Sequence, residues 1–216
     1  MVFITDEKIY KKAKKELNCK KVEDICKKYK KQWGKYLKNV DEFSTYFSPI
    51  LAIINKHYPN LKNIKTLEIG FRYPAFIDVL KSKEAITYGI DFDPYYTGKN
   101  LLKMSVENIS KEFLKEHQNS FDIIYQRLCL SRLLNEMGEK GKKFLFTKTD
   151  KILKDLTSLL KPNGMLILLD DRGTIFTLKQ FKENKLKKIE KECPIILKNK
   201  NREYLGWNIL AVYKKH

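Results

Sequence analysis

The most informative part of the sequence is the stretch Thr66-Leu67-Glu68-Ile69-Gly70-Phe71-Arg72-Tyr73-Pro74. Residues Thr66 to Ile69 predict a buried strand that runs into a turn at Gly70. Pro74 suits the first turn of a helix, where a missing backbone N–H costs nothing. An acidic residue on the strand, a glycine turn and a following helix are typical of a nucleotide-type site. The same pattern also occurs as plain architecture, so the order of the later elements has to decide.

From residue 64 onward, short apolar runs alternate with helical patterns. We expect strands over 64–69, 85–90, 101–104, 121–125 and 165–169, then 187–190 (extending to 197 in one interpretation) and 207–213. Helices are expected over 75–80, 106–117, 147–160 and 176–183, with another beginning at 128–134. Apolar strands separated by helices form a parallel sheet that is covered on both faces. The predicted fold is therefore α/β, a doubly wound, mostly parallel, seven-stranded Rossmann-like sheet.

The first 60 residues have a different character, being strongly basic and helical in pattern. Apolar residues recur at helical spacing over 9–29 and 46–57, and Tyr58-Pro59-Asn60 ends the last helix. We therefore predict an N-terminal helical cap or lid over 1–60 and a Rossmann-like domain over 61–216. A cap that binds substrate and a layer that only covers the sheet fit this pattern equally well.

Composition limits the partners that the protein can have. The formal net charge is +18, which favours RNA or another polyanion as a partner. Only five of the 44 basic residues are arginine, however, and nucleic-acid readers usually rely on arginine. A chain rich in Lys, Ile and Asn also fits an A/T-rich coding sequence, so the charge by itself leaves both explanations open.

Location and metal content are also constrained by the residue types. No apolar run approaches the roughly 18 residues that a membrane span requires, and the N-terminus lacks the order of a signal peptide. We expect a cytoplasmic protein with no membrane partner. The four cysteines show no C-x-x-C spacing and have no histidine at ligand spacing, so free thiols and no metal site are expected.

Polar residues follow several of the predicted strands at their carboxyl ends. These residues are Glu68, Asp91, Arg127 and Asp170. Right-handed crossovers bring the carboxyl ends of parallel strands to one edge, where ligands bind in open α/β sheets. The sequence therefore predicts that these four side chains meet at a single site.

The order of these motifs resembles that of the class I, Rossmann-like S-adenosylmethionine (SAM) methyltransferases. Residues 66–70 are similar to the first motif of that family, and Gly89-Ile90-Asp91 to the second. Residues 120–124 resemble its fourth strand, and 159–166 resemble the helix and turn that enter its fifth. Residues 207–213 resemble its antiparallel seventh strand, so the resemblance covers roughly 60–216.

The resemblance implies SAM as the cofactor and suggests roles for individual residues. Asp91 would accept hydrogen bonds from the ribose hydroxyls, Gly70 would let the backbone approach the cofactor, and Arg72 or Tyr73 would meet the SAM carboxylate. The full expected set of cofactor-binding residues is Glu68, Gly70, Phe71, Arg72, Tyr73, Asp91, Phe92, Ser105, Val106, Gln126 and Arg127.

The sequence departs from the family pattern in two places. Arg72 and Pro74 stand where further glycines are common, and Ser105-Val106 follow the third strand where an acidic residue is frequent. These departures keep a catalytically silent binding module on the same fold as an alternative.

The acceptor side of the site is defined less sharply. Asp170 and Asp171 follow the fifth strand and are the expected catalytic residues, since a carboxylate there can take a proton from a hydroxyl or an amine. The same pair could instead contribute to a divalent-metal site. An aromatic helical stripe places Trp33, Tyr36 and Tyr46 near the expected acceptor. The predicted function is SAM-dependent methyl transfer to an O or N atom of a small molecule, and RNA methylation through the basic lid is the alternative.

Overall fold

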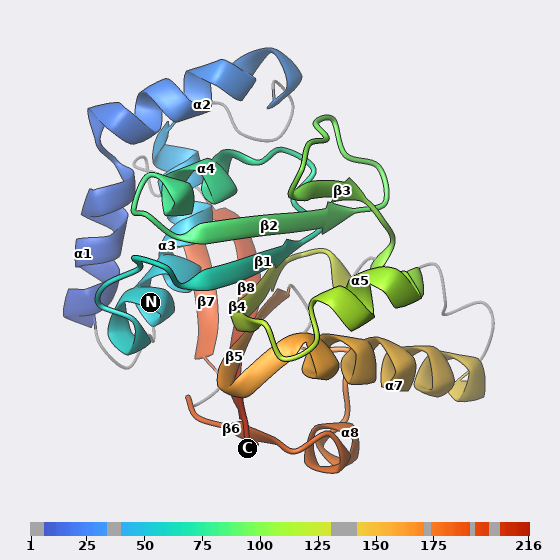
Figure 1. Cartoon of the computed structure of the whole chain (residues 1–216). Helices are drawn as coiled ribbons and strands as arrows, with labels where there is room; N and C mark the ends of the chain where they lie inside the picture. Colours follow the sequence, from blue (N-terminus) through green and yellow to red (C-terminus); the bar gives the residue numbers. More distant parts are fainter. Residues whose placement is uncertain (1–6, 34–39, 131–141, 171–173, 191–192, 199–203) are drawn as a thin grey trace.

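A computed structural model describes residues 7–33, 40–130, 142–170, 174–190, 193–198 and 204–216. The chain builds an α/β structure around one eight-stranded sheet (Figure 1). The strands are β1 (Lys65–Ile69), β2 (Ile86–Asp91), β3 (Leu101–Lys103), β4 (Phe121–Arg127), β5 (Leu160–Asp170), β6 (Leu186–Lys188), β7 (Cys193–Lys198) and β8 (Tyr204–Lys215). The helices are α1 (Glu7–Leu17), α2 (Lys20–Trp33), α3 (Val40–His57), α4 (Ala75–Lys81), the 3₁₀ turn η1 (Val106–Asn108), α5 (Lys111–Glu116), α7 (Lys142–Leu159) and α8 (Leu178–Glu183).

The sheet has the order β3-β2-β1-β4-β5-β8-β6, and β7 also pairs with β8. Strands β1 to β5 run parallel, whereas β8 is antiparallel to β5. The predicted doubly wound, mostly parallel sheet is thus confirmed along a path of seven strands. Because the strand order reverses at β1 and β4, the carboxyl ends of these strands form the switch point where ligands bind in such folds.

The eighth strand arises from an interruption near the C-terminus. In place of the one strand expected over 187–190, or to 197 in one interpretation, the chain forms β6 and β7, which pair with successive parts of β8. The backbone N–H of Ile189 donates to the carbonyl of Val212 (3.0 Å), which continues the ladder just past β6. β7 and β8 are antiparallel neighbours, as a hairpin requires, although the connecting residues lie outside the described part of the chain.

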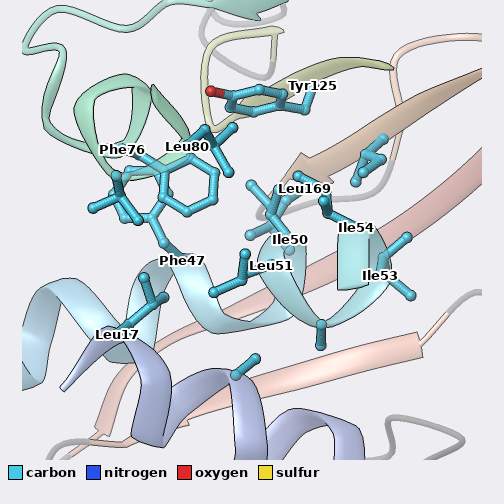
Figure 2. Packing of buried hydrophobic residues seen from close by; sticks show 14 of the residues in the cluster. Leu17, Phe47, Ile50, Leu51, Ile53, Ile54, Phe76, Leu80, Tyr125 and Leu169 are labelled. Carbon is cyan, nitrogen blue, oxygen red and sulfur yellow. The ribbon is translucent and has the colours of Figure 1, made fainter. Parts of the chain in front are cut away.

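Two layers of helices bury the two faces of the sheet. Helices α1 to α4 share one hydrophobic cluster with one face, and α5, α7 and α8 share another with the opposite face. Figure 2 shows Leu17 of α1 and Phe47 of α3 in the same cluster as Phe76 of α4 and Leu169 of β5. Each buried Leu or Phe contributes about 1.5–3 kcal/mol through the hydrophobic effect, so these clusters fix the strand ends in place.

The prediction of one continuous helix over 106–117 is wrong, because this segment forms two elements, η1 and α5. Ser105 accepts a hydrogen bond from the Glu107 N–H (3.3 Å) and Ser110 accepts one from the Phe113 N–H (3.1 Å). A serine that caps a new helix start competes with continuation of the preceding helix. Two serines five residues apart therefore start two short elements in place of one helix. Of the helix expected from 128, the residues from 131 onward lie outside the described part.

Candidate functional site

The turn after β1 contains a glycine that no other residue could replace without strain. Gly70 has φ +74°, a conformation that L side chains rarely adopt. A Cβ atom at this position would lie 2.5 Å from both Cβ and Sγ of Cys129. The Gly70 N–H donates to the carbonyl of Ile90 on β2 (2.8 Å), so the turn is held against the neighbouring strand.

Asp91, at the end of β2, connects two loops at this edge. Its side chain is buried; Oδ2 accepts from the backbone N–H of Arg72 (2.9 Å) and Oδ1 from that of Asp93 (2.8 Å). The carboxylate thus fixes both the turn after β1 and the start of the loop that leads to β3. A carboxylate offers about four lone-pair sites, so its two oxygens can each accept a further hydrogen bond.

An aromatic pair ties the loop after β2 to the turn after β1. The rings of Tyr73 and Tyr95 stack with centroids 4.7 Å apart at an interplanar angle of 5°. Arg72 donates from Nη2 to the Tyr95 hydroxyl (3.0 Å), and the Tyr95 N–H donates to the Arg72 carbonyl (3.1 Å). Hydrogen bonding to Arg72 lowers the pKa of Tyr95, whereas burial raises the pKa of Tyr73 to about 12. Sequence analysis missed Tyr95, because no periodicity marks a loop residue.

Glu68 lies inside the protein, on the face of the sheet that α3 and α4 cover. It is fully buried and accepts a hydrogen bond from the Tyr125 hydroxyl (3.0 Å) on the neighbouring strand β4. Burial raises the pKa of Glu68 to about 8, against smaller lowering effects of Tyr125 and Arg127. The pKa of Tyr125 is raised well above its usual value by burial and by Glu68. Glu68 is therefore mostly protonated at neutral pH.

Arg127 ends β4 and points toward the N-terminal helices. Its guanidinium carbon lies 4.7 Å from the ring centroid of Tyr46 and 5.1 Å from that of Phe47, both on α3. Burial raises the pKa of Tyr46, and Arg127 partly opposes this shift. Tyr46, one of the residues predicted near the acceptor, therefore contacts the carboxyl end of β4. Trp33 is the last residue of α2, but its side chain lies outside the described part of the structure, as does all of Tyr36.

Gln126 and Asp170 form a second polar pair, on the opposite face of the sheet from Arg127. Gln126 donates from Nε2 to Oδ2 of the buried Asp170 (2.6 Å), and its Oε1 accepts from the Cys129 N–H (2.9 Å). Gln126 thereby links the ends of β4 and β5 to the segment after β4. Asp171 lies outside the described residues, so the predicted catalytic role of this pair stays a prediction.

The remaining predicted cofactor residues differ widely in exposure. Phe92 directly follows Asp91 and is 69% exposed, whereas Val106 is buried. Ser105 is half-buried and caps η1. Phe71 is buried, and a Cβ placed on Gly89 would lie 2.6 Å from its ring, so Phe71 packs onto β2 and does not face the strand edge.

Three further features concern metal ligands, thiols and the character of the helices. Within the described ranges, no group of three or more His, Cys, Asp or Glu side chains is arranged to hold a metal ion. Cys19, Cys26 and Cys129 are free thiols, and burial raises the pKa of Cys26 to about 12. In that part of the chain, none of the helices has the length and apolar character needed to cross a membrane.

Comparisons with known proteins identify the fold. No protein-family model and no curated protein matches this chain. Among solved structures, an S-adenosylmethionine-dependent methyltransferase from Mesorhizobium loti matches with a TM-score of 0.55 and 11% identity, over 79% of this chain and 98% of that one. A SAM-dependent methyltransferase from Methanosarcina mazei matches with a TM-score of 0.52 and 14% identity, over 76% of this chain and 96% of that one.

A third match was solved with ligands bound. It is 1,6-didemethyltoxoflavin-N1-methyltransferase from Burkholderia thailandensis, with bound 1,6-didemethyltoxoflavin and S-adenosylhomocysteine. It has a TM-score of 0.53 and 11% identity, over 90% of this chain and 86% of that one. At such low identities the likeness concerns the fold. This chain has the Rossmann-like fold of the SAM-dependent methyltransferases.

Proposed function

We propose that the protein is a SAM-dependent methyltransferase that transfers a methyl group to an oxygen or nitrogen atom of a small-molecule acceptor. The observation that carries this proposal is the buried carboxylate of Asp91 at the end of β2, tied to the backbone of the turn around Gly70. Within this fold, an acidic residue at that strand end is suited to the hydroxyls of a ribose. The Burkholderia neighbour, which was solved with a small molecule and S-adenosylhomocysteine, supports the small-molecule class.

The residues present fit the cofactor in character. Asp91 has acceptor capacity beyond its two backbone partners, and Phe92 beside it offers an exposed aromatic ring for a nucleobase. Arg72 would pair with a carboxylate, whereas the space beside Gly70 is filled by Cys129. When bound, SAM supplies a methyl group on a sulfonium centre that is already activated for displacement. Orientation of the acceptor by the protein therefore contributes much of the catalysis.

We assign the two aspartates after the core of β5 different roles in the transfer. Asp170, the last residue of β5, is buried and accepts from Gln126, which supports a positioning role for Asp170. Asp171 stays the proposed proton acceptor, since it follows directly in the sequence. In the transfer, a bond forms between the acceptor atom and the methyl carbon while the carbon–sulfur bond breaks. The proton of the acceptor passes to the base.

Calorimetric titration with S-adenosylhomocysteine tests the proposal. Asp91→Ala should weaken binding by about 1–3 kcal/mol, or roughly 5–150-fold, because buried donors lose their acceptor. Asp93→Ala is the matched control, because it removes an exposed carboxylate from the same loop. Asp93 bonds to Asp91 through its backbone N–H, which the substitution keeps. Absence of S-adenosylhomocysteine binding by the wild type, or equal affinity of Asp91→Ala, would refute the assignment. Binding without turnover on any acceptor would favour the silent binding module.

RNA methylation is a second candidate, favoured by one observation. The lysines Lys11, Lys12 and Lys15 are all exposed on α1. Phosphate contacts release counterions, so RNA binding through α1 would weaken steeply with salt. Binding of a short RNA measured at two ionic strengths, with and without Lys11→Gln and Lys12→Gln, separates this candidate from the first.

A further inference from the structure

Arginine is distributed in this chain in a way that its composition does not predict. Only five of the 44 basic residues are arginine. Arg72 lies three residues after β1, and Arg127 is the last residue of β4. Arg132 and Arg172 follow β4 and β5 in the sequence and lie outside the described residues. In the described part of this lysine-rich chain, the two arginines, Arg72 and Arg127, thus both lie at or just after the carboxyl end of a central strand.

The two side chains differ in what they recognise. The guanidinium of arginine is planar and presents a rigid fork of N–H donors that matches carboxylate and phosphate oxygens in pairs. Lysine provides a point charge on a flexible stem. Where a chain with this bias retains arginine, a requirement for the planar fork is the simplest physical reason.

Arg127 is held in a defined orientation. Contacts with the rings of Tyr46 and Phe47, at 4.7 and 5.1 Å, engage its guanidinium through cation–π attraction. Such contacts use the charge of the group, while recognition of an anion uses the N–H donors in its plane. A guanidinium already oriented in this way loses less entropy when an anion binds.

The charge of Arg127 is only weakly opposed by Glu68, a buried acid on the adjacent strand β1. Glu68 interacts electrostatically with Arg127 from the adjacent strand, but burial raises the pKa of Glu68 to about 8. Near neutral pH that carboxyl is mostly uncharged, so Glu68 does little to neutralise the charge of Arg127. Glu42, in the first turn of α3, interacts electrostatically with Tyr46.

We infer that Arg127 binds an anionic group of the methyl acceptor, a carboxylate or a phosphate ester carried by a small molecule. This rests on the proposed function and revises the role expected for Arg127, from cofactor to acceptor. The revision follows from its position: Arg72 and Asp91 lie on the β2 side of β1, whereas Arg127 lies on the β4 side and faces α3. Tyr46 would then contact the body of the same acceptor.

The test uses the full chain and three probes, with and without saturating S-adenosylhomocysteine. The probes are benzoate, phenyl phosphate and the neutral benzamide. The binding of each probe is measured by ligand-observed NMR titration. We expect at least one anionic probe to bind at least tenfold more tightly than benzamide, and the stronger one identifies the anion. Arg127→Lys should weaken that probe at least tenfold, since it keeps the charge but loses the fork. The affinity of the Arg127→Lys variant for S-adenosylhomocysteine should stay within twofold of the wild-type value.

The matched control is Lys103→Gln, which removes an exposed charge at the end of β3, three strands from β4 in the same sheet, and should change the binding of neither ligand. The inference is overturned if benzamide binds as well as the anions, or if a folded Arg127→Lys variant binds the anions like the wild type. It is also overturned if Lys103→Gln weakens anion binding as much as Arg127→Lys does, since the overall positive charge of the protein would then account for the binding. Absence of S-adenosylhomocysteine binding together with Arg127-dependent anion binding would refute the proposed function and leave the anion site standing.

Discussion

A single buried carboxyl, Glu68, is expected to make stability depend on pH. Its pKa is raised by burial from 4.5 to about 8 in the folded protein. In the unfolded chain the group ionises near pH 4.5, so raising the pH from about 5 to 8 favours the unfolded state. The stabilisation that the protonated carboxyl provides below pH 4.5 is thus lost as the pH rises through 8. At about 1.4 kcal/mol per pKa unit, the loss is roughly 5 kcal/mol at most.

The comparison with Glu68→Gln isolates this effect, because the other titrating groups are common to both proteins. We expect the variant to gain stability relative to the wild type as the pH rises from 5 to 8, measured by urea unfolding at several pH values. A constant difference over that range would mean that Glu68 ionises normally in the folded protein.

Gly70 gives a second prediction at the scale of one residue. Gly70→Ala should lower the free energy of unfolding by roughly 2–5 kcal/mol, because the backbone is left-handed and the new Cβ overlaps Cys129. Gly98→Ala is the control, since no atom lies within 4 Å of a Cβ built there. It should change stability by less than about 0.5 kcal/mol. Equal effects of the two substitutions in urea unfolding would contradict this account of the turn.

At the scale of elements, the loop between β2 and β3 is predicted to act as a latch on the turn after β1. Tyr95→Ala removes the stack on Tyr73 and the hydrogen bond from Arg72, whereas Tyr95→Phe removes only the hydrogen bond. An aromatic pair is worth about 0.5–1.5 kcal/mol, so Tyr95→Ala should weaken S-adenosylhomocysteine binding roughly 2–12-fold. Tyr95→Phe should have a smaller effect.

Hydrogen exchange provides a direct readout of the latch. The backbone N–H of Tyr95 donates to the Arg72 carbonyl, so this amide should exchange faster in Tyr95→Ala. Lys99→Gln, an exposed change in the same loop, should leave both measurements unchanged. The latch would have to be abandoned if Tyr95→Ala alters neither the exchange rate nor the affinity.

The central strands could be predicted from sequence because their patterning is local. β1 and β4 are buried on both faces, as central parallel strands are, and the motif order then suggests their neighbours. The break between η1 and α5 could not be predicted from periodicity, since the apolar spacing continues through Ser110. The split of β6 from β7 depends on pairing with β8, which is information from a distant part of the chain.

The candidate site was predictable to a similar degree. Gly70 and Asp91 follow adjacent parallel strands, so their proximity follows from topology. The position of Tyr46 was expected only in general terms, and its contact with Arg127 depends on how α3 packs against the sheet. Tyr95 could not be found because its contacts depend on the path of a loop.

At the scale of the whole molecule, the first three helices and the sheet are connected through one core. Leu17 of α1 and Tyr29 of α2 are buried in the cluster that also contains strand residues of β4 and β5. Tyr29 donates to Asp78 of α4 (2.5 Å), and Lys83 pairs with Glu16 of α1. The predicted division of the chain at residue 60 stays a prediction. Because the two parts share one core, we expect them to unfold together.

The two tryptophans allow that argument to be tested, because Trp33 ends α2 and Trp207 lies in β8. In Trp207→Phe the fluorescence reports only on the N-terminal helices, and in Trp33→Phe only on the sheet. We expect both proteins to unfold in urea with coincident midpoints. Leu17→Ala should lower stability by about 2–5 kcal/mol for both reporters, because Leu17 is fully buried. Leu178→Ala, at a position that is 74% exposed, should shift neither midpoint appreciably. If Leu17→Ala moved only the Trp33 transition, the helices would be a separate unit, as a mobile lid requires.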